Sequence, residues 1–145
     1  MKHILLVILI GMSGSGKDTI KDYLVKDGYK ELELFTTRPK RSNDESGYDF
    51  ISYEEYLEKM KSGIVLESRK YQIETTGETW YYGTYIPDMS KVKDGDKYVV
   101  ISTIDGTKVI KEILGKESSK NDVIISFVPL ILDLSYHERL KRILN

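Results

Sequence analysis

Two patterns of apolar and polar residues alternate along the chain, one with the period of a strand and one with the period of a helix. The continuous aliphatic run Ile4–Ile10 predicts a strand that is buried on both faces. The alternating segment Glu31–Thr37 predicts a second strand. Further segments with strand character are Ile64–Ile73, Trp80–Thr84, Lys97–Ile104 and Val123–Val128.

Helix signals lie between these strands. The first helix is expected to end at about Lys26, before Asp27-Gly28, because glycine readily terminates a helix. Ser52-Tyr-Glu-Glu55 has the spacing of a capping box and predicts a helix that ends near Gly63. The remaining helices are expected near Thr107–Leu114 and over Tyr136–Leu144, the latter opening at the capping box Ser135-Tyr-His-Glu138.

The order of these elements predicts an α/β fold, a three-layer domain around a mostly parallel sheet. Region 35–84 breaks the alternation with a polar loop at 38–47 and a hairpin whose turn covers Glu74–Thr79. We therefore expect a single domain over 1–145, with a core of about 1–34 and 85–145 and a small inserted α+β subdomain of about 35–84 that binds a substrate. In such folds the ligand lies at the carboxyl ends of the strands.

The segment directly after the first strand has the composition of a phosphate-binding P-loop. Residues 11–19 read Gly-Met-Ser-Gly-Ser-Gly-Lys-Asp-Thr. Glycines let successive backbone N–H groups converge on phosphate oxygens, the next helix adds its positive N-terminal end, and Lys17 adds a full charge. The strict pattern has Ser or Thr directly after the lysine, whereas this chain has Asp18 there and Thr19 next. The alternative, an accidental lysine in a glycine-rich turn, is disfavoured by the strand before it and the helix after it.

A second anion-binding set lies in the middle of the chain. Arg38 and Arg41 place two guanidinium groups three residues apart in a loop, and arginine is the natural bidentate partner of a terminal phosphate. Tyr48, Tyr81 and Tyr82 can donate hydroxyl groups to the same phosphate or stack on a base. Taken without the P-loop, the two arginines could equally be a solvated pair of loop charges.

Two carboxylates have open alternatives. Glu67 follows the apolar stretch Ile64–Leu66 and can accept paired N–H donors, such as those on the edge of guanine, or it can lie on the solvent face of a strand. Asp105 is either the N-cap of the helix that follows it or a residue on the metal side of a nucleotide site.

Composition limits the classes of partner. The chain has 145 residues and a formal net charge of −1, which argues against a general nucleic-acid-binding surface but permits a local basic pocket. It has no cysteine, so disulfides and thiolate metal sites are excluded and a cytoplasmic location is permitted. We expect neither a nucleic-acid nor a membrane partner, and the sequence does not determine the oligomeric state.

Four motifs, in this order, resemble those of the guanylate kinase family. They are Gly-x-Ser-Gly-x-Gly-Lys-x-Thr at 11–19, Thr-Thr-Arg-x-x-Arg at 36–41, Tyr-x-Phe-Ile-Ser-x-Glu-Glu at 48–55 and Tyr-Tyr-Gly-Thr at 81–84. The resemblance covers roughly residues 4–142 and implies transfer of the γ-phosphoryl group of ATP to GMP or dGMP, with Mg²⁺ bridging the ATP phosphates. Nucleoside monophosphate kinases often carry a non-hydroxyl residue directly after the P-loop lysine, as Asp18 does here.

The resemblance also implies roles for individual residues. The ATP-binding set is Gly11, Ser13, Gly14, Ser15, Gly16, Lys17, Asp18 and Thr19. The acceptor-binding set is Arg38, Arg41, Tyr48 and Tyr82 on the phosphate, Glu67 and Thr84 on guanine, and Asp105 as one acidic residue of the family's Asp-x-Asp segment. The catalytic cations are Lys17, Arg38, Arg139 and Arg142. Asp18 either helps to position Mg²⁺ through water or caps the helix that follows.

The chain departs from the family pattern in four places. Leu34 stands where the family has a serine that contacts the base, and Thr103 replaces the other acidic residue of the Asp-x-Asp segment. The loop between Arg41 and Tyr48 is shorter than usual by about two residues, while Glu74–Trp80 resembles an insertion. The chain ends at Asn145, about where the family's mobile lid begins, so we expect a shortened chain or a minimal relative.

These departures keep other functions open. A kinase for another nucleoside monophosphate is one alternative, because Leu34 and the altered loops affect the base site. A guanylate-kinase-like module that binds a protein partner without catalysis is another, although such modules usually lose P-loop glycines or the lysine, and Gly11, Gly14, Gly16 and Lys17 are all present here. A P-loop enzyme that hydrolyses ATP with water would need a water-positioning residue, and none is evident.

Overall fold

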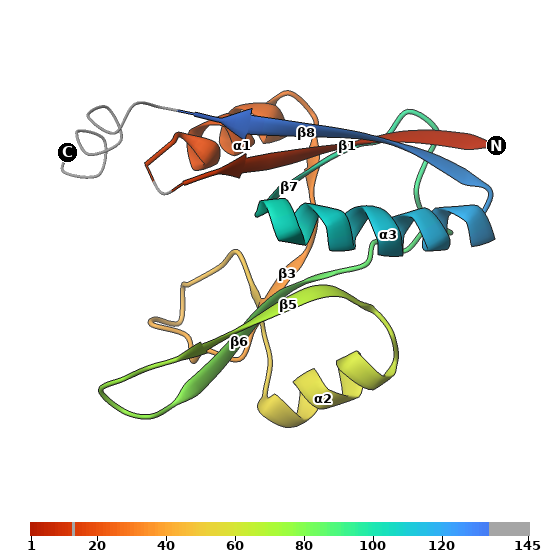
Figure 1. Cartoon of the computed structure of the whole chain (residues 1–145). Helices are drawn as coiled ribbons and strands as arrows, with labels where there is room; N and C mark the ends of the chain where they lie inside the picture. The colour runs from red at the N-terminus through yellow and green to blue at the C-terminus, as the bar shows by residue number, and fades with distance from the viewer. Residues whose placement is uncertain (13, 134–145) are drawn as a thin grey trace. The chain divides into compact units, whose positions relative to one another are not determined.

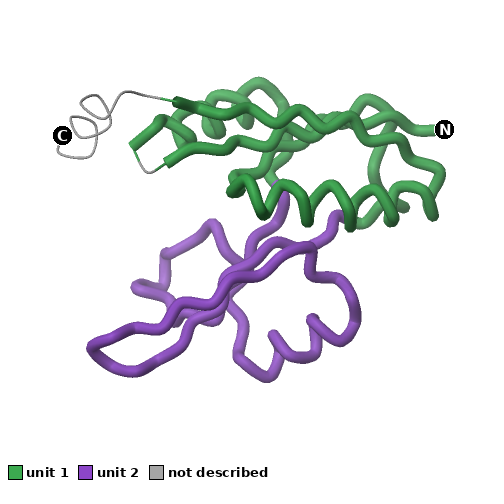
Figure 2. Tube along the Cα trace, viewed as in Figure 1, with its two compact units in different colours: residues 1–31, 88–145 green, residues 32–87 purple. Residues whose placement is uncertain are grey.

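The computed structural model describes residues 1–12 and 14–133 and has the expected α/β fold with a mostly parallel sheet (Figure 1). The chain divides into two compact units, coloured separately in Figure 2. Unit 1 comprises residues 1–31 and 88–145, and unit 2 comprises Leu32–Pro87. No helix within the described ranges has both the length and the apolar character needed to cross a membrane.

Unit 1 is built on a four-stranded sheet in which each adjacent pair of strands is parallel. The strands, in their order across the sheet, are β2 (Lys30–Glu31), β7 (Lys97–Ser102), β1 (Lys2–Gly11) and β8 (Val123–Leu132). The central strand β1 is almost entirely buried from Leu6 to Ile10, as its unbroken aliphatic sequence predicts. Pro129, which lacks a backbone N–H, lies in β8 at the edge of the sheet, where a strand tolerates it.

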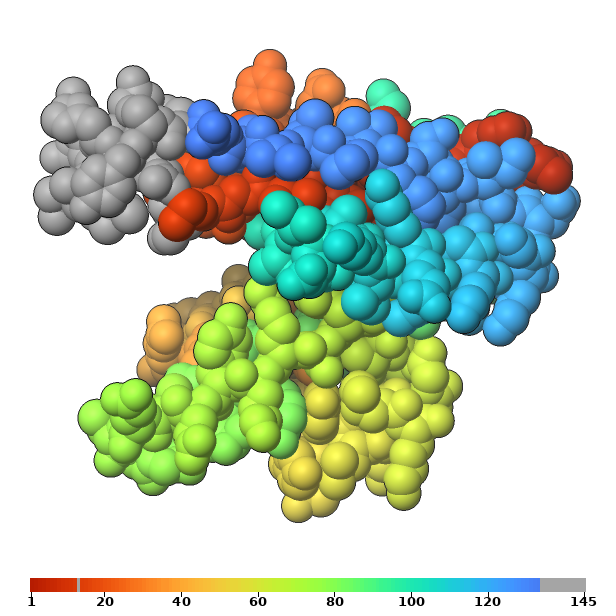
Figure 3. Space-filling view, in the orientation of Figure 1, coloured from red at the N-terminus to blue at the C-terminus, as the bar shows by residue number. Residues whose placement is uncertain are grey.

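Two helices cover the two faces of this sheet. Helix α1 (Lys17–Lys26) packs Ile20 and Leu24 against odd-numbered residues of β1 and against Val99. Helix α3 (Ile104–Lys120) lies on the opposite side, next to β8, and its side chains form a continuous surface with that strand (Figures 1 and 3). Unit 1 therefore has helix, sheet and helix as its three layers.

Unit 2 is a smaller sheet with one helix. Its strands, in their order across the sheet, are β4 (Asp49–Phe50), β3 (Leu34–Thr36), β6 (Thr79–Tyr85) and β5 (Val65–Gln72). Strand β6 is antiparallel to both neighbours, and the backbone N–H of Tyr85 extends its pairing by donating to the carbonyl of Glu33 at 2.9 Å. Helix α2 (Tyr53–Lys61) opens with the predicted capping box between Ser52 and Glu55.

The two faces of the unit 2 sheet differ in character. On one face Phe35, Tyr85 and Tyr81 pack with Tyr56 of α2, and the rings of Tyr56 and Tyr81 stack at 4.4 Å between centroids. Strand register places a second set of residues in rows on the other face, because alternate residues of a strand point to opposite sides. We call this the polar face, and it comprises Leu34, Thr36, Glu67, Arg69, Tyr82 and Thr84.

A polar loop connects β3 to β4, and a single carboxylate ties it together. Both oxygens of Glu45 accept hydrogen bonds from the guanidinium of Arg38, at 3.1 and 2.5 Å, and one also accepts from the backbone N–H of Arg41 at 2.7 Å. Hydrogen bonds from Arg38 and then from Arg41 hold the pKa of Glu45 at about 2. One carboxylate therefore bonds to two residues of the loop, Arg38 and Arg41, and holds the loop in its folded conformation.

The structure differs from the sequence-based expectations in two elements. The expected strand Glu31–Thr37 is two strands, β2 in the sheet of unit 1 and β3 in that of unit 2, because Leu32 and Glu33 lie between them in neither ladder. Helix α3 is much longer than Thr107–Leu114 and begins directly after Thr103. The expected helix Tyr136–Leu144 lies outside the described residues.

Gly83 allows a close approach of strands and ring in unit 2, and a test follows from it. A Cβ at this position would lie 2.3 Å from Cζ of Phe35 and 2.4 Å from the carbonyl oxygen of Glu67. We expect Gly83→Ala to destabilise the protein by about 1–3 kcal/mol in chemical denaturation, because the neighbours must move. Gly115→Ala in α3, where a Cβ meets nothing within 4 Å, is the control and should stabilise by about 0.5–1 kcal/mol. Equal stability of Gly83→Ala and the wild type would contradict the close contact.

The contacts of Glu45 predict how stability depends on pH. The pKa of Glu45 is lowered from 4.5 to about 2 by folding, so its contribution to stability is present above about pH 4.5 and is lost as the pH falls toward 2. E45Q cannot titrate at this position. Urea denaturation from about pH 7 to pH 2.5 should therefore show the stability difference between the wild type and E45Q narrowing in acid. E58Q, which changes an exposed carboxylate on α2, is the control, and a difference for E45Q that is constant with pH would rule out this role.

Candidate functional site

The P-loop lies between the end of β1 and the start of α1. Gly14 and Gly16 have φ angles of 81° and 94°, in the region that favours glycine, and they make the turn into the helix possible. Gly16 is the N-cap of α1 and has no side chain with which to cap it. The first N–H groups of α1 are thus left for a ligand, and a helix N-terminus with such groups binds phosphate.

The side chains of the P-loop differ in exposure. Lys17 opens α1 and is half-buried, while Asp18 and Thr19 in the same turn are exposed. The hydroxyl of Ser15 is buried and makes no hydrogen bond within the described residues. Ser13 falls outside the described residues, so its predicted role in ATP binding stays a prediction.

A second polar group lies nearby in the same unit, at the carboxyl end of β7. The hydroxyl of Ser102 is buried and, like that of Ser15, has no hydrogen-bond partner among the described residues. Ser102 pairs with Ile10, the residue before Gly11, across the parallel ladder. Both hydroxyls therefore lie at the edge of the sheet where α/β proteins bind their ligands.

In unit 2, Arg38 is fixed from several sides. Only 5% of its side-chain surface is exposed, and hydrogen bonding to Glu45 is the main cause that raises its pKa, with Tyr82 as a smaller contributor. Its guanidinium also lies over the ring of Phe50, 5.6 Å from the centroid. Arg38 is thus a rigid, permanently charged group.

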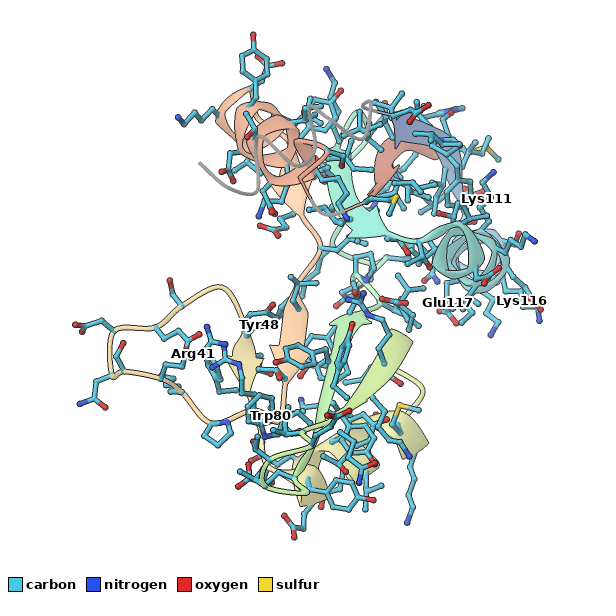
Figure 4. All side chains as sticks on the ribbon, turned by 60° about the vertical axis from the view of Figure 1, so that its left-hand side comes forward. Arg41, Tyr48, Trp80, Lys111, Lys116 and Glu117 are labelled. Carbon is cyan, nitrogen blue, oxygen red and sulfur yellow. The ribbon has the colours of Figure 1, made fainter. Side chains whose placement is uncertain are left out.

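Arg41 and Tyr48 complete the set expected around the phosphate. Arg41 is exposed on the loop after β3, and Tyr48 lies directly before β4 (Figure 4). Tyr48 contacts Tyr82 edge-on, at 5.9 Å between ring centroids. Tyr82 in turn hydrogen bonds to Arg38 and contributes to raising its pKa. The structure therefore connects Arg38, Tyr82 and Tyr48 through contacts, with Arg41 three residues along the same loop.

The residues expected at the base lie in a row of the polar face. Thr84 of β6 pairs with Leu34 on one side and Glu67 on the other. Thr84 is buried, and the side chain of Glu67 has 13% of its surface exposed, so Glu67 is not a fully solvated strand residue. Nε of Arg69, two residues along the same strand, lies 3.9 Å from Oε1 of Glu67.

The structure decides against one of the three candidate tyrosines. The sequence allowed Tyr81 either to donate to the phosphate or to stack on a base, but its ring stacks on Tyr56 in the core on the other face of the sheet. Consecutive residues of a strand point to opposite faces, so only one of the pair can lie on the polar face. Tyr71 is half-exposed and contacts Tyr82 edge-on at 5.4 Å.

Asp105 is not a helix cap. The side chain of Thr103 caps α3 by accepting a hydrogen bond from the backbone N–H of Gly106 at 2.9 Å, and Asp105 is exposed in the first turn. A metal-side role for Asp105 stays a prediction. Arg139 and Arg142, the expected catalytic arginines near the end of the chain, lie outside the described residues.

Glu45 is the residue of this region that sequence reasoning missed. It follows Asp44 in an exposed polar loop, and neither periodicity nor spacing distinguishes the two carboxylates. Its only signal is its position four residues after Arg41 and seven after Arg38, which has meaning only once the loop turns back on itself.

Comparison with known proteins identifies the family. The family model for guanylate kinase matches residues 4–131. Guanylate kinase of Mycoplasma mobile is 32% identical over 152 aligned residues, which cover 100% of this chain and 71% of that protein. Guanylate kinase of Lactobacillus johnsonii is 30% identical, with 97% of this chain covered, and the match spans 65% of that protein's length.

A solved structure supports the fold. The crystal structure of guanylate kinase from Anaplasma phagocytophilum superposes with a TM-score of 0.55 at 18% identity, covering 99% of this chain and 66% of that one. The fold, the P-loop and the match over most of the chain agree, and this chain belongs to the guanylate kinase family.

Proposed function

We propose that this chain binds ATP and a nucleoside monophosphate, favouring GMP or dGMP, and transfers the γ-phosphoryl group to give ADP and the nucleoside diphosphate. The observation that carries the proposal is the second recognition set in unit 2, where Tyr82, a hydrogen-bond partner of the buried Arg38, lies on the polar face together with Glu67. A protein that only hydrolyses ATP has no need of such a set. A cytoplasmic location, where these substrates occur, is part of the same proposal.

On the donor side, the P-loop supplies positive potential for the phosphates of ATP. The uncapped N-terminus of α1 offers backbone N–H groups, and Lys17 adds a positive charge at the same place. The buried Ser15 and Ser102 hydroxyls are further groups that a bound nucleotide and its water would satisfy. Gly11, Gly14 and Gly16 let the phosphates approach the backbone, and Thr19 and Ser13 complete the proposed set.

The donor set fits Mg²⁺ that arrives with ATP. Within residues 1–12 and 14–133 there is no group of three His, Cys, Asp or Glu side chains that could hold a metal by itself. Magnesium is usually bound through one carboxylate, several waters and the substrate phosphates, and the exposed Asp18 beside Lys17 suits that arrangement. When bound, the ion supplies positive charge to the phosphate oxygens.

On the acceptor side, Arg38, Arg41, Tyr48 and Tyr82 would bind the monophosphate. The guanidinium groups pair with phosphate oxygens and the tyrosine hydroxyls donate to them. The Glu67 carboxylate would accept from the N1–H and the amino group of guanine, with Thr84 beside it in the same row. Adenine has no such pair of donors, so Glu67 would favour guanine.

The chemistry then requires no covalent intermediate. An oxygen of the acceptor phosphate forms a bond to Pγ while the bond from Pγ to the β–γ bridging oxygen breaks, and ADP leaves with that oxygen. The attacking oxygen is already ionised, so no general base is needed. Lys17 and Arg38, together with Arg139 and Arg142, would stabilise the charge that moves. Asp105 is proposed to belong to the set of residues that bind the nucleoside monophosphate.

One observation favours a second candidate, a kinase with broader base specificity. Leu34 pairs with Thr84 on the polar face, so an aliphatic side chain lies next to the proposed base contacts. Leucine cannot donate a hydrogen bond to the guanine carbonyl. Another nucleoside monophosphate is therefore expected to compete with GMP better than it would in a relative with a hydroxyl group at this position.

Replacing the P-loop lysine tests the reaction. A coupled ADP-release assay with ATP, Mg²⁺ and GMP should show turnover by the 145-residue chain, reduced at least ~100-fold in Lys17→Ala because a cation on the transferred group is lost. Lys26→Ala, an exposed residue in the last turn of the same helix, is the matched control and should retain activity. Unchanged turnover in Lys17→Ala would reject the assignment.

A panel of nucleotides tests the acceptor. Thermal unfolding with GMP, dGMP, AMP and dTMP should show the largest stabilisation for the two guanine nucleotides, about 2.7 kcal/mol at a hundred times Kd. Glu67→Gln should reduce the preference for guanine, because an amide cannot accept two donors equally well. Equal shifts for all four nucleotides would exclude base recognition by Glu67.

A further inference from the structure

The guanidinium of Arg38 is only partly used by its partners. Its five N–H protons form a planar fork. Nη1 donates to Oε1 of Glu45 at 3.1 Å and to the carbonyl of Pro39 at 3.0 Å, and Nη2 donates to Oε2 of Glu45. Glu45 therefore occupies the end of the fork, and Pro39 takes the second proton of Nη1.

The protons that remain lie together. They are the Nε–H and the second proton on Nη2, which point in the same direction along the adjacent edge of the guanidinium. Two parallel N–H groups are the geometry that binds two oxygens of a phosphate. Tyr82, the other side chain that hydrogen bonds to Arg38, is a proposed partner of the same phosphate. Glu45 thus leaves the other edge of Arg38 to be shared by the Tyr82 hydroxyl and a ligand.

Glu45 controls the second arginine through its backbone. The Oε1 atom that binds Arg38 also accepts from the backbone N–H of Arg41 at 2.7 Å, while the Arg41 side chain is exposed. The loop position of Arg41 and the orientation of Arg38 are consequently set by one carboxylate. With 5% of Arg38 exposed, that orientation decides which of its protons a ligand can reach.

We propose that Glu45 is a positioning residue for the acceptor phosphate: it binds the end of the Arg38 fork and the backbone of Arg41, and so presents the remaining edge of Arg38 and the side chain of Arg41 to one phosphate group. This inference rests on the proposed function. It assigns Glu45 no contact with the substrate, and its effect is specific to the phosphate rather than the base.

The opposite role makes an opposite prediction. If Glu45 competed with the phosphate for Arg38, its removal would free a cation and tighten nucleotide binding. If Glu45 only supported the fold of unit 2, its removal would weaken binding of nucleoside and nucleotide alike. The three roles therefore differ in the ratio of the affinities for guanosine and GMP.

The experiment measures that ratio by calorimetry on the full chain. For E45A we expect GMP to bind about tenfold to a hundredfold more weakly, with guanosine affinity unchanged, because a buried charged group loses its partner and orientation. E45Q, which keeps one acceptor oxygen, should lie between E45A and the wild type. In the coupled assay the same variants should raise the KM for GMP and leave the KM for ATP unchanged.

E58A, at an exposed carboxylate on α2, should change neither affinity, and thermal unfolding checks that each variant is folded. Tighter or unchanged GMP binding by E45A, or an equal loss for GMP and guanosine, would overturn the inference. Calorimetry needs no turnover, so a chain that binds GMP without phosphorylating it would defeat the proposed function while the Glu45 comparison still gave its own result. A wild type with no preference for GMP over guanosine would overturn both.

Discussion

Gly83 of β6 has no side chain, and this lets the ring of Phe35 in β3 and the backbone carbonyl of Glu67 in β5 approach β6 closely. That approach fixes the register of β3, β6 and β5, since a shift by one residue would bring a tyrosine or a threonine to the crowded position. The register in turn decides which residues share a face. Tyr82, Thr84, Glu67 and Arg69 lie together on the polar face because Gly83 faces the core.

A buried arginine imposes a second constraint on unit 2. A guanidinium with almost no exposed surface is costly to bury unless its charge is paired, and the two carboxylate oxygens of Glu45 pair with it through two hydrogen bonds. The loop after β3 therefore turns back so that Glu45 reaches Arg38. Recognition of an anion and stability of the loop consequently depend on the same ion pair, and a substitution there is expected to affect both.

Much of this could be predicted from the sequence where the signals are local. The aliphatic run of β1, the glycines of the P-loop and the capping box of α2 each depend on neighbouring residues, and the elements are found where they were expected. Contacts between distant residues were not predictable. The alternating segment Glu31–Thr37 has the same period whether it joins one sheet or two, and the face taken by Tyr81 depends on pairing with another strand. The role of Glu45 could not be predicted, because it depends on the conformation of the loop that brings Glu45 to Arg38.

The hydrogen bond between Glu33 and Tyr85 joins the two ends of unit 2. Unit 1 is interrupted in sequence by the whole of Leu32–Pro87, yet this segment leaves and returns through neighbouring strands that are bonded to each other. Bringing the two ends of this segment together costs chain entropy, and the contacts formed within unit 2 offset that cost. For the folding of unit 1, the segment is therefore equivalent to a short loop. Such an arrangement tolerates changes in the length of the inserted segment, so the hairpin of unit 2 can lengthen or shorten in the course of evolution without disturbing the parallel sheet that carries the P-loop.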